Sequence, residues 1–155
     1  MTYRITGLDP APYKPLFGLT DTELANRGAV RMTVTEKPSF PCRVSLTDRE
    51  IGETVLLVNH VSHDVANPYR ASHAIFVTEG EDEAGEYVDE VPPVFGPRVL
   101  SLRGFDADGM MAAATLTQQG EADAGIRSLF DNPAIETIHA HNATRGCFAA
   151  KIERN

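Results

Sequence analysis

The stretch ETIHAHNATRGCFAAKI, residues 136–152, decides how the C-terminal part of the chain folds. Its two halves, on either side of NATRG (142–146), have the composition of strands, so the stretch predicts a β-hairpin with a five-residue loop. Side chains alternate along a strand, which puts His139 and His141 on one face. With this loop, His141 lies opposite Cys147 and His139 lies opposite Ala149. A change of one residue in loop length instead places Asn142 opposite Cys147.

This hairpin has three interpretations. A histidine beside Cys147 can hold a thiolate, which is the nucleophile in acyl- and thiol-transfer chemistry. Alternatively, His139, His141 and Cys147 bind zinc, with Cys42 or another histidine as the fourth ligand. In the third interpretation Cys147 is a buried small apolar residue and the histidines hydrogen-bond locally. The spacing matches no specific motif, which favours this structural interpretation.

Upstream of the hairpin, the sequence predicts two helices and several strands. Thr20 and Glu23 form a capping box at the start of a short helix that Gly28 ends. Residues 121–133, EADAGIRSLFDNP, are amphipathic and predict a longer helix. Strand composition marks residues 29–34, 41–46, 53–61, 72–79, 98–105 and 110–117.

The order of these elements predicts the fold class. Short strands outnumber helices, and most connections between them are typical of antiparallel neighbours. We therefore expect one α+β domain over residues 1–155. It has a mainly antiparallel sheet, one short N-terminal helix and one longer helix before the C-terminal β-hairpin.

The charge of the chain is concentrated in one segment. The formal net charge is −8, and residues 79–90, EGEDEAGEYVDE, hold 7 of the 22 acidic residues and no basic one. Such a run is typical of a solvated connecting loop, although a patch that binds a partner is the alternative. The basic residues are scattered, so we expect no nucleic-acid partner.

The sequence also indicates where the protein is found. It has neither a signal-peptide pattern nor an apolar run near the roughly 20 residues of a membrane helix, so we expect a cytoplasmic protein without membrane contact. Cys42 and Cys147 are then expected to be reduced thiols. No nucleotide-binding motif is present, and DADG (106–109) lacks the later ligands of a calcium loop. We therefore assign no residue to a metal or a cofactor.

A second set of candidate residues lies at the ends of predicted strands. Arginine binds carboxylates and phosphates through two parallel hydrogen bonds. If Arg43, Arg70 and Arg103 converge near the hairpin, the ligand is a small anion. Alternatively, each arginine pairs with an acidic residue at the surface. The full set of candidates for ligand binding is Cys42, Arg43, Tyr69, Arg70, Arg103 and Asp106.

Four motifs together resemble a known family. FPCRVSL (40–46), PYRASHAIFV (68–77), LRGFDADGMM (102–111) and IHAHNATRGCFAAKI (138–152) are similar, in this order, to the bacterial domain of unknown function 1203 family. The resemblance implies a small single-domain bacterial protein without an assigned activity, and it implies divergence from relatives in residues 79–90. The matching positions are Cys42, Arg43, Tyr69, Arg70, Arg103, Asp106, His139, His141, Asn142, Gly146 and Cys147.

Two classes of function follow from these residues. In the first, the hairpin is a thiol-dependent enzyme site or a site for a small anionic ligand. Cys147 is then the nucleophile, His141 its base with His139 beside it, and Asn142 an orienting partner, while arginines hold the anion. In the second, the protein is a non-catalytic structural or interaction module, and copies of the chain pair through sheet edges as a homo-oligomer.

Overall fold

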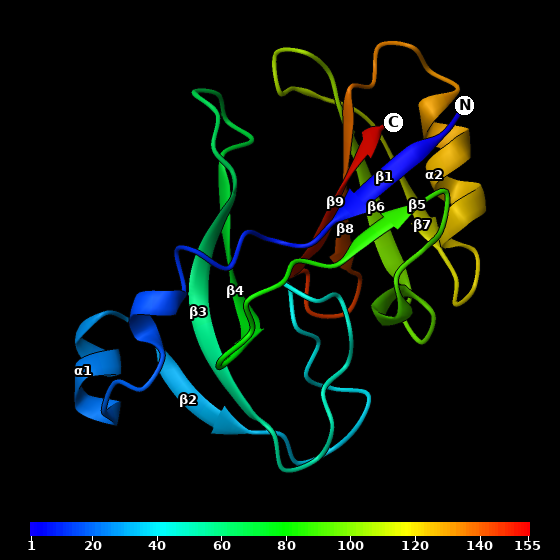
Figure 1. The fold of residues 1–155 in the computed structure, drawn as a ribbon. Coiled ribbons are helices and arrows are strands. Elements are labelled where there is room, and N and C mark those ends of the chain that lie inside the picture. The colour runs from blue at the N-terminus through cyan, green and yellow to red at the C-terminus, as the bar shows by residue number, and fades with distance from the viewer.

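The strands form two sheets in which every pair of neighbouring strands runs antiparallel. The structure is a computed structural model that describes all residues, 1–155. The larger sheet has the order β5 (Glu86–Val88), β1 (Tyr3–Thr6), β9 (Phe148–Arg154), β8 (Thr137–Asn142), β6 (Leu100–Phe105), β7 (Met111–Thr117). The smaller sheet has the order β2 (Val30–Thr33), β3 (Thr54–His63), β4 (Ala71–Thr78). Figure 1 shows the long β3–β4 hairpin beside the larger sheet.

The longer helix, α2 (Ala122–Phe130), covers one face of the larger sheet (Figure 1). Its apolar side chains Ile126 and Phe130 belong to the same buried cluster as Leu102 on β6 and Ile138 on β8. Because side chains alternate along β8, the residues next to Ile138 point away from this cluster. That alternation directs His139 and its neighbours on the same face toward the smaller sheet.

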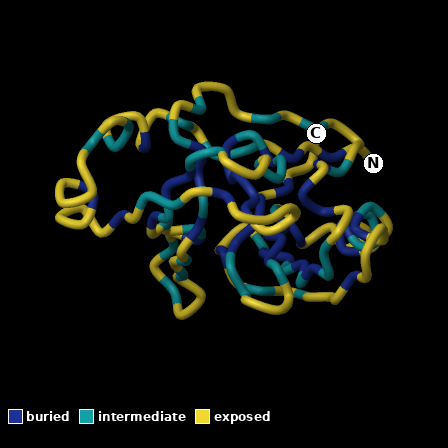
Figure 2. Tube along the Cα trace, turned by 90° about the horizontal axis from the view of Figure 1, so that it is seen from below, coloured by how far each residue is buried: buried dark blue, intermediate teal, exposed yellow.

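The smaller sheet has its own buried cluster, which includes Leu56, Ile75 and Cys42 and is covered by α1 (Asp21–Asn26). The predicted capping box is confirmed: the Thr20 hydroxyl accepts from the Glu23 backbone N–H at 3.2 Å, and the Glu23 carboxylate accepts from the Thr20 N–H at 2.7 Å. Two short 3-10 helices, η1 (Lys14–Leu16) and η2 (Pro93–Phe95), lie in connections. Buried residues gather where the strands approach one another, and the connecting loops are exposed (Figure 2).

Two expectations about individual elements were wrong, and one strand was missed. Residues 41–46 form a compact turn with isolated bridges instead of a strand, and Leu46 has a positive φ of 59°. The acidic run 79–90 is not loop throughout, because it contains β5, which pairs with β1. Strand β1 itself was not predicted. All three involve contacts between segments that are distant in sequence, such as the close approach of Gly7 to the carbonyl oxygen of Val44.

The fold class is the expected one: an α+β protein with antiparallel sheets, a short N-terminal helix and a longer helix before the C-terminal hairpin. The strands are divided between two sheets, where the sequence predicted one. Helices in this structure are too short or too polar to span a membrane.

Candidate functional site

The C-terminal hairpin, β8–β9, has the second of the two predicted registers. The backbone N–H of Asn142 donates to the Cys147 carbonyl at 3.0 Å, and the Gly146 N–H donates to the Asn142 carbonyl at 2.7 Å. Asn142 therefore lies opposite Cys147, while His141 pairs with Phe148 across an irregularity in the ladder. Gly146 takes a left-handed φ of 76°, which closes the shorter loop over residues 143–146. The expected pairing of His141 with Cys147 was wrong.

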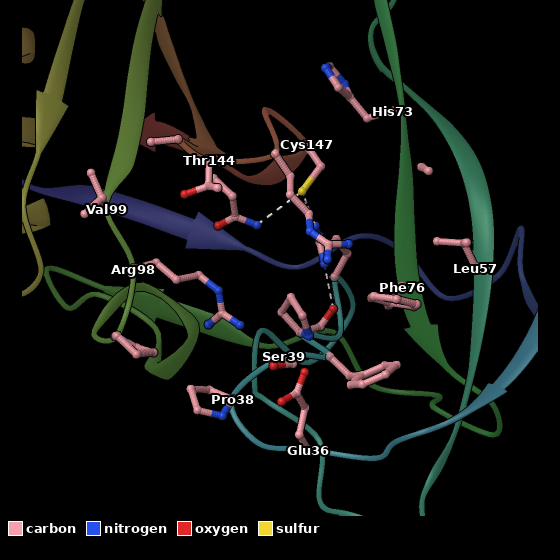
Figure 3. A pocket seen from close by; sticks show the side chains of 18 of the residues that line it. Glu36, Pro38, Ser39, Leu57, His73, Phe76, Arg98, Val99, Thr144 and Cys147 are labelled. Carbon is pink, nitrogen blue, oxygen red and sulfur yellow. Dashed lines mark hydrogen bonds between the residues drawn. The ribbon is translucent and has the colours of Figure 1, made fainter.

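Two side-chain donors contact the sulfur of Cys147. The Nη2 group of Arg43 donates to Sγ at 3.2 Å, and the Nδ2 group of Asn142 donates to Sγ at 3.3 Å (Figure 3). Asn142 comes from the end of β8, directly across the hairpin. Arg43 comes from the compact turn at residues 41–46, on the side of the smaller sheet.

Arg43 is held rigidly by the backbone around it. Its Nε donates to the Phe148 carbonyl at 2.8 Å, and its Nη1 donates to the Pro41 carbonyl at 2.8 Å. The residue is only 3% exposed, and this burial lowers the pKa of the guanidinium. None of the ion pairs in the structure includes Arg43. The sulfur of Cys147 is thus the only side-chain partner of this buried cation.

Cys147 and Arg43 line a pocket of about 910 Å³ between the hairpin loop and the smaller sheet. Leu57 and Phe76 extend toward it from β3 and β4, opposite Cys147 (Figure 3). The apolar part of the wall includes Met32, Phe40, Leu57, Phe76, Pro38 and Pro97. The polar part around the thiol consists of Arg43, Asn142, Thr144, Arg145 and His73.

The other two predicted arginines, Arg70 and Arg103, do not lie near the hairpin loop as expected. Arg70 forms an exposed ion pair with Asp64, and Arg103 donates to Ser101 Oγ at 3.3 Å. Neither lines the pocket, so the three predicted arginines do not converge on it. Two arginines that were not singled out from the sequence do line it. Arg98 is neutralised by two hydrogen bonds to Asp48, at 2.6 and 2.8 Å, whereas Arg145 has no ion pair or hydrogen bond in the structure.

The remaining predicted residues lie outside the pocket. Cys42 is fully buried in the smaller sheet's cluster, where its sulfur accepts from the Thr78 N–H at 3.3 Å. Asp106 accepts from two backbone N–H groups and so closes the turn between β6 and β7. Tyr69 is exposed and packs against the edge of Phe105.

The histidines form a layer between the two sheets. His139 lies 5.0 Å from the ring of His63 on β3, and His141 lies 4.9 Å from the ring of His73 on β4. Burial, aided by neighbouring cationic groups, lowers the pKa of His139 to about 3. Burial likewise lowers the pKa of His141 to about 4, against the opposing effect of its bond to the Gly146 carbonyl. His60 and His73 also have lowered pKa values, chiefly through burial.

His141 contacts the backbone of the hairpin loop in this geometry. Its Nδ1 lies 3.0 Å from the Gly146 carbonyl oxygen, which can only accept, so Nδ1 carries the proton. No hydrogen bond joins His141 or His139 to the sulfur of Cys147. The structure also contains no group of three or more His, Cys, Asp or Glu residues arranged to hold a metal ion.

Comparisons with known proteins place the chain in a family. No curated protein matches it, and no solved structure matches it. A family model described as a protein of unknown function (DUF1203) matches residues 39–154, a range that includes Arg43, Asn142 and Cys147. This match covers most of the chain, and the protein therefore belongs to the DUF1203 family of proteins of unknown function.

Proposed function

We propose that this protein is a thiol-dependent enzyme or sensor in which Cys147 acts as a thiolate nucleophile on a small molecule bound in the pocket. The observation that carries this proposal is the buried guanidinium of Arg43, whose only side-chain partner is the sulfur. A buried cation without a counter-charge is costly by several kcal/mol. A thiolate on Cys147 supplies that counter-charge, and Asn142 contributes a second donor to it.

This arrangement differs from the cysteine–histidine pair that the sequence suggested. No imidazole contacts the sulfur, so no general base removes its proton at the moment of reaction. A thiolate already paired with Arg43 needs none. The same absence leaves no imidazole to protonate a poor leaving group, such as the amine released in amide cleavage. The proposed chemistry is therefore attack on a bond whose leaving group departs without an acid.

The location of Cys147 supports a reaction between its sulfur and a small molecule bound in the pocket. The residue is partly exposed, in contrast to the fully buried Cys42, and it borders a pocket large enough for an organic molecule. The apolar wall formed by Leu57 and Phe76 lies across the pocket from the sulfur (Figure 3).

A second candidate function is the binding of a small anion without chemistry. The observation that favours it is Arg145, a cation that lines the pocket without an ion pair. Benzoate and benzyl alcohol are a matched pair of probes, because they differ in the carboxylate. If the pocket binds anions, calorimetry detects benzoate alone, and Arg145→Gln abolishes the signal. Equal binding of the two probes, or none, contradicts this candidate.

The thiolate proposal is tested by the rate of alkylation of the folded protein with iodoacetamide, followed by mass spectrometry of Cys147 and Cys42. At pH 7 we expect Cys147 to react about tenfold faster than N-acetylcysteine, because the guanidinium of Arg43 contacts the sulfur and stabilises negative charge on it. Cys42 serves as the internal control and stays unmodified. Arg43→Gln and Asn142→Leu should each slow the reaction, and Thr144→Ala, a neighbouring change in the pocket, should not.

The outcomes separate the alternatives. If Cys147 reacts no faster than the free thiol, or only after unfolding, the sulfur is a structural group and the proposal is wrong. Because Arg43→Gln removes bonds to two carbonyls and can unfold the chain, Asn142→Leu provides the second measurement. Unchanged reactivity in a folded Asn142→Leu protein would show that the side chain does not stabilise the thiolate.

A further inference from the structure

The outer edge of strand β7 has no neighbouring strand. β7 (Met111–Thr117) is the last strand of the larger sheet, and its partner there is β6. The pairing with β6 is regular over residues 113–117, before which the ladder has a β-bulge. Apart from this ladder, no backbone hydrogen bond in the structure involves residues 111–117. Free N–H and C=O groups at the edge of a sheet are a template on which a further strand can pair.

The ladder between β6 and β8 shows which residues of β6 bond to β7. Leu100 of β6 lies opposite Asn142 of β8. The Ala143 N–H donates to the Val99 carbonyl at 3.0 Å, and a bond in this position flanks a pair whose own backbone groups point away from each other. Leu100 and every second residue after it therefore direct their N–H and C=O groups toward β7.

The alternation along β7 then identifies its free groups. Thr117 and Thr115 lie opposite Leu100 and Leu102, so their backbone groups bond to β6. The remaining residues of the regular part direct their N–H and C=O groups outward, and these are Ala114 and Leu116.

This edge is uncharged and exposed. Residues 110–117, MMAAATLT, contain neither a charged residue nor a proline. Ala114, Thr115 and Leu116 are all exposed, and Leu116 is 58% exposed. Thr115 is on the same face as Thr117, which packs against Gly125 of α2. The exposure of Thr115 therefore shows that the helix leaves the edge of the strand free.

The other three sheet edges are protected. β5 has only three residues, among them Glu86. β2 carries Arg31, which forms an ion pair with Glu79. The outer edge of β4 is partly occupied, because the Phe76 carbonyl accepts from the Arg43 N–H at 2.9 Å. Short strands, charges and covering segments keep sheet edges from pairing, and the regular part of β7 has neither a charge nor a cover.

The charge distribution favours a second copy of the chain as the partner of this edge. The acidic residues 79–90 include β5, which is at the opposite edge of the larger sheet from β7. The rest of the chain has 15 acidic and 14 basic residues and is nearly neutral. Two copies that meet at β7 therefore join through an uncharged strand and keep their acidic segments at the far edges.

We infer that β7 pairs antiparallel with β7 of a second copy, about a two-fold axis that passes between the two Thr115 residues. Ala114 then lies opposite Leu116 of the second copy, and Leu116 lies opposite Ala114 of the second copy. The free N–H and C=O groups of both residues bond across the axis, and none is left without a partner. Each Leu116 side chain covers a small alanine, and the two Thr115 side chains meet on the other face. The same surface serves both copies, as two-fold symmetry requires, and the pairing is independent of the chemistry proposed for Cys147.

The interface is small, because each copy contributes one short strand. Stable interfaces bury about 1,200–2,000 Å² in total, which is more than one such pair of strands supplies. We therefore expect a dissociation constant on the order of 100 µM. Sedimentation velocity of the full-length protein should show monomers at about 5 µM and mostly dimers at about 1 mM.

Two variants test the position of the interface. Ala114→Pro removes a free N–H without removing a bond to β6, and Thr115→Lys places two like charges opposite each other. Each should weaken dimerisation more than about tenfold, because every change at a two-fold axis acts in both copies. Val30→Lys is the matched control, since it adds a lysine to an exposed position of another edge strand, β2, and should leave the dissociation constant unchanged.

A cross-link tests the register. In a Cys147→Ser background, Thr115→Cys places two thiols in a directly opposed pair whose Cα atoms are about 4.5 Å apart, a separation that a disulfide spans. Mild oxidation should join two copies of this variant. Val30→Cys in the same background should remain monomeric over the same time.

Three results would overturn the inference. The first is a protein that stays monomeric at about 1 mM, well above the expected dissociation constant. The second is a dimer that persists in a folded Thr115→Lys protein, because its interface then lies elsewhere on the surface. The third is equal cross-linking of Thr115→Cys and Val30→Cys, which indicates random collision. If Ala114→Pro fails to fold, Thr115→Lys and the cross-link still decide.

Discussion

Acidification from pH 7 to pH 5 should destabilise the protein through the histidine layer between its sheets. His139 and His141 are 3% and 2% exposed, and their pKa values are lowered to about 3 and about 4. In the unfolded chain both have the ordinary value near 6.5. Below pH 6.5 the unfolded chain therefore binds protons that the folded protein does not, so stability is lost as the pH falls. At pH 5, this difference is about 2 kcal/mol for each imidazole.

The prediction is checked by urea unfolding at pH 7 and pH 5. Together the two imidazoles should reduce the free energy of unfolding by about 4 kcal/mol, a large part of the usual 5–15 kcal/mol. His139→Phe replaces the imidazole by a ring that cannot titrate, among the aromatic neighbours Phe105 and Phe148. Between the two pH values, the free energy of unfolding of the variant should fall by about 2 kcal/mol less than that of the parent.

Carboxylates contribute little to this pH dependence above pH 5, because their ordinary pKa values in the unfolded chain are near 4. In the folded protein, arginine partners lower the pKa values of Glu53, Glu79 and Asp123 further. The dependence of the free energy on urea concentration serves as a control, because an unchanged slope shows that the same surface unfolds at both pH values. The reasoning would be refuted if the free energy of unfolding fell by the same amount in the parent and in His139→Phe between pH 7 and pH 5. So would an NMR titration in which His139 becomes protonated above pH 5 in the folded protein.

Three further predictions concern the framework around the site. In Gly7→Ala the added Cβ meets the Val44 carbonyl oxygen at 1.7 Å, so urea unfolding should show a loss of about 3 kcal/mol. Arg98→Met leaves Asp48 without its partner, and because that carboxylate is only 7% exposed, a loss of about 3 kcal/mol is expected by the same assay; a loss below the error would mean that solvent replaces the partner. Thr20→Ala should lower stability by about 1 kcal/mol through loss of the helix cap, and Thr20→Ser should retain it.

Features set by neighbouring residues could be predicted from the sequence. The capping box at Thr20 and Glu23 needs only four consecutive positions, and the structure has both of its hydrogen bonds. The amphipathic pattern of residues 121–133 likewise indicated α2 and its buried face. The two strands around the C-terminal loop were also placed correctly, because their composition is local information.

Features set by the packing of distant segments could not be predicted. The register of the hairpin depends on the left-handed conformation of Gly146, and a shift of one residue exchanged His141 for Asn142 opposite Cys147. The approach of Arg43 to the sulfur depends on how residues 41–46 fold against β9. The sequence identified both Cys147 and Arg43 as candidates, but their contact follows from the arrangement of the two sheets.

The hydrogen bond between Arg43 and Cys147 also has a consequence for the order of folding, because it joins residues 104 positions apart. Adjacent strands such as β8 and β9 pair rapidly, whereas closing a loop of that length is a slow step. When the complete chain folds from the unfolded state, Cys147 is therefore part of a local hairpin before Arg43 reaches it. The sulfur acquires its charged partner only when the two sheets dock.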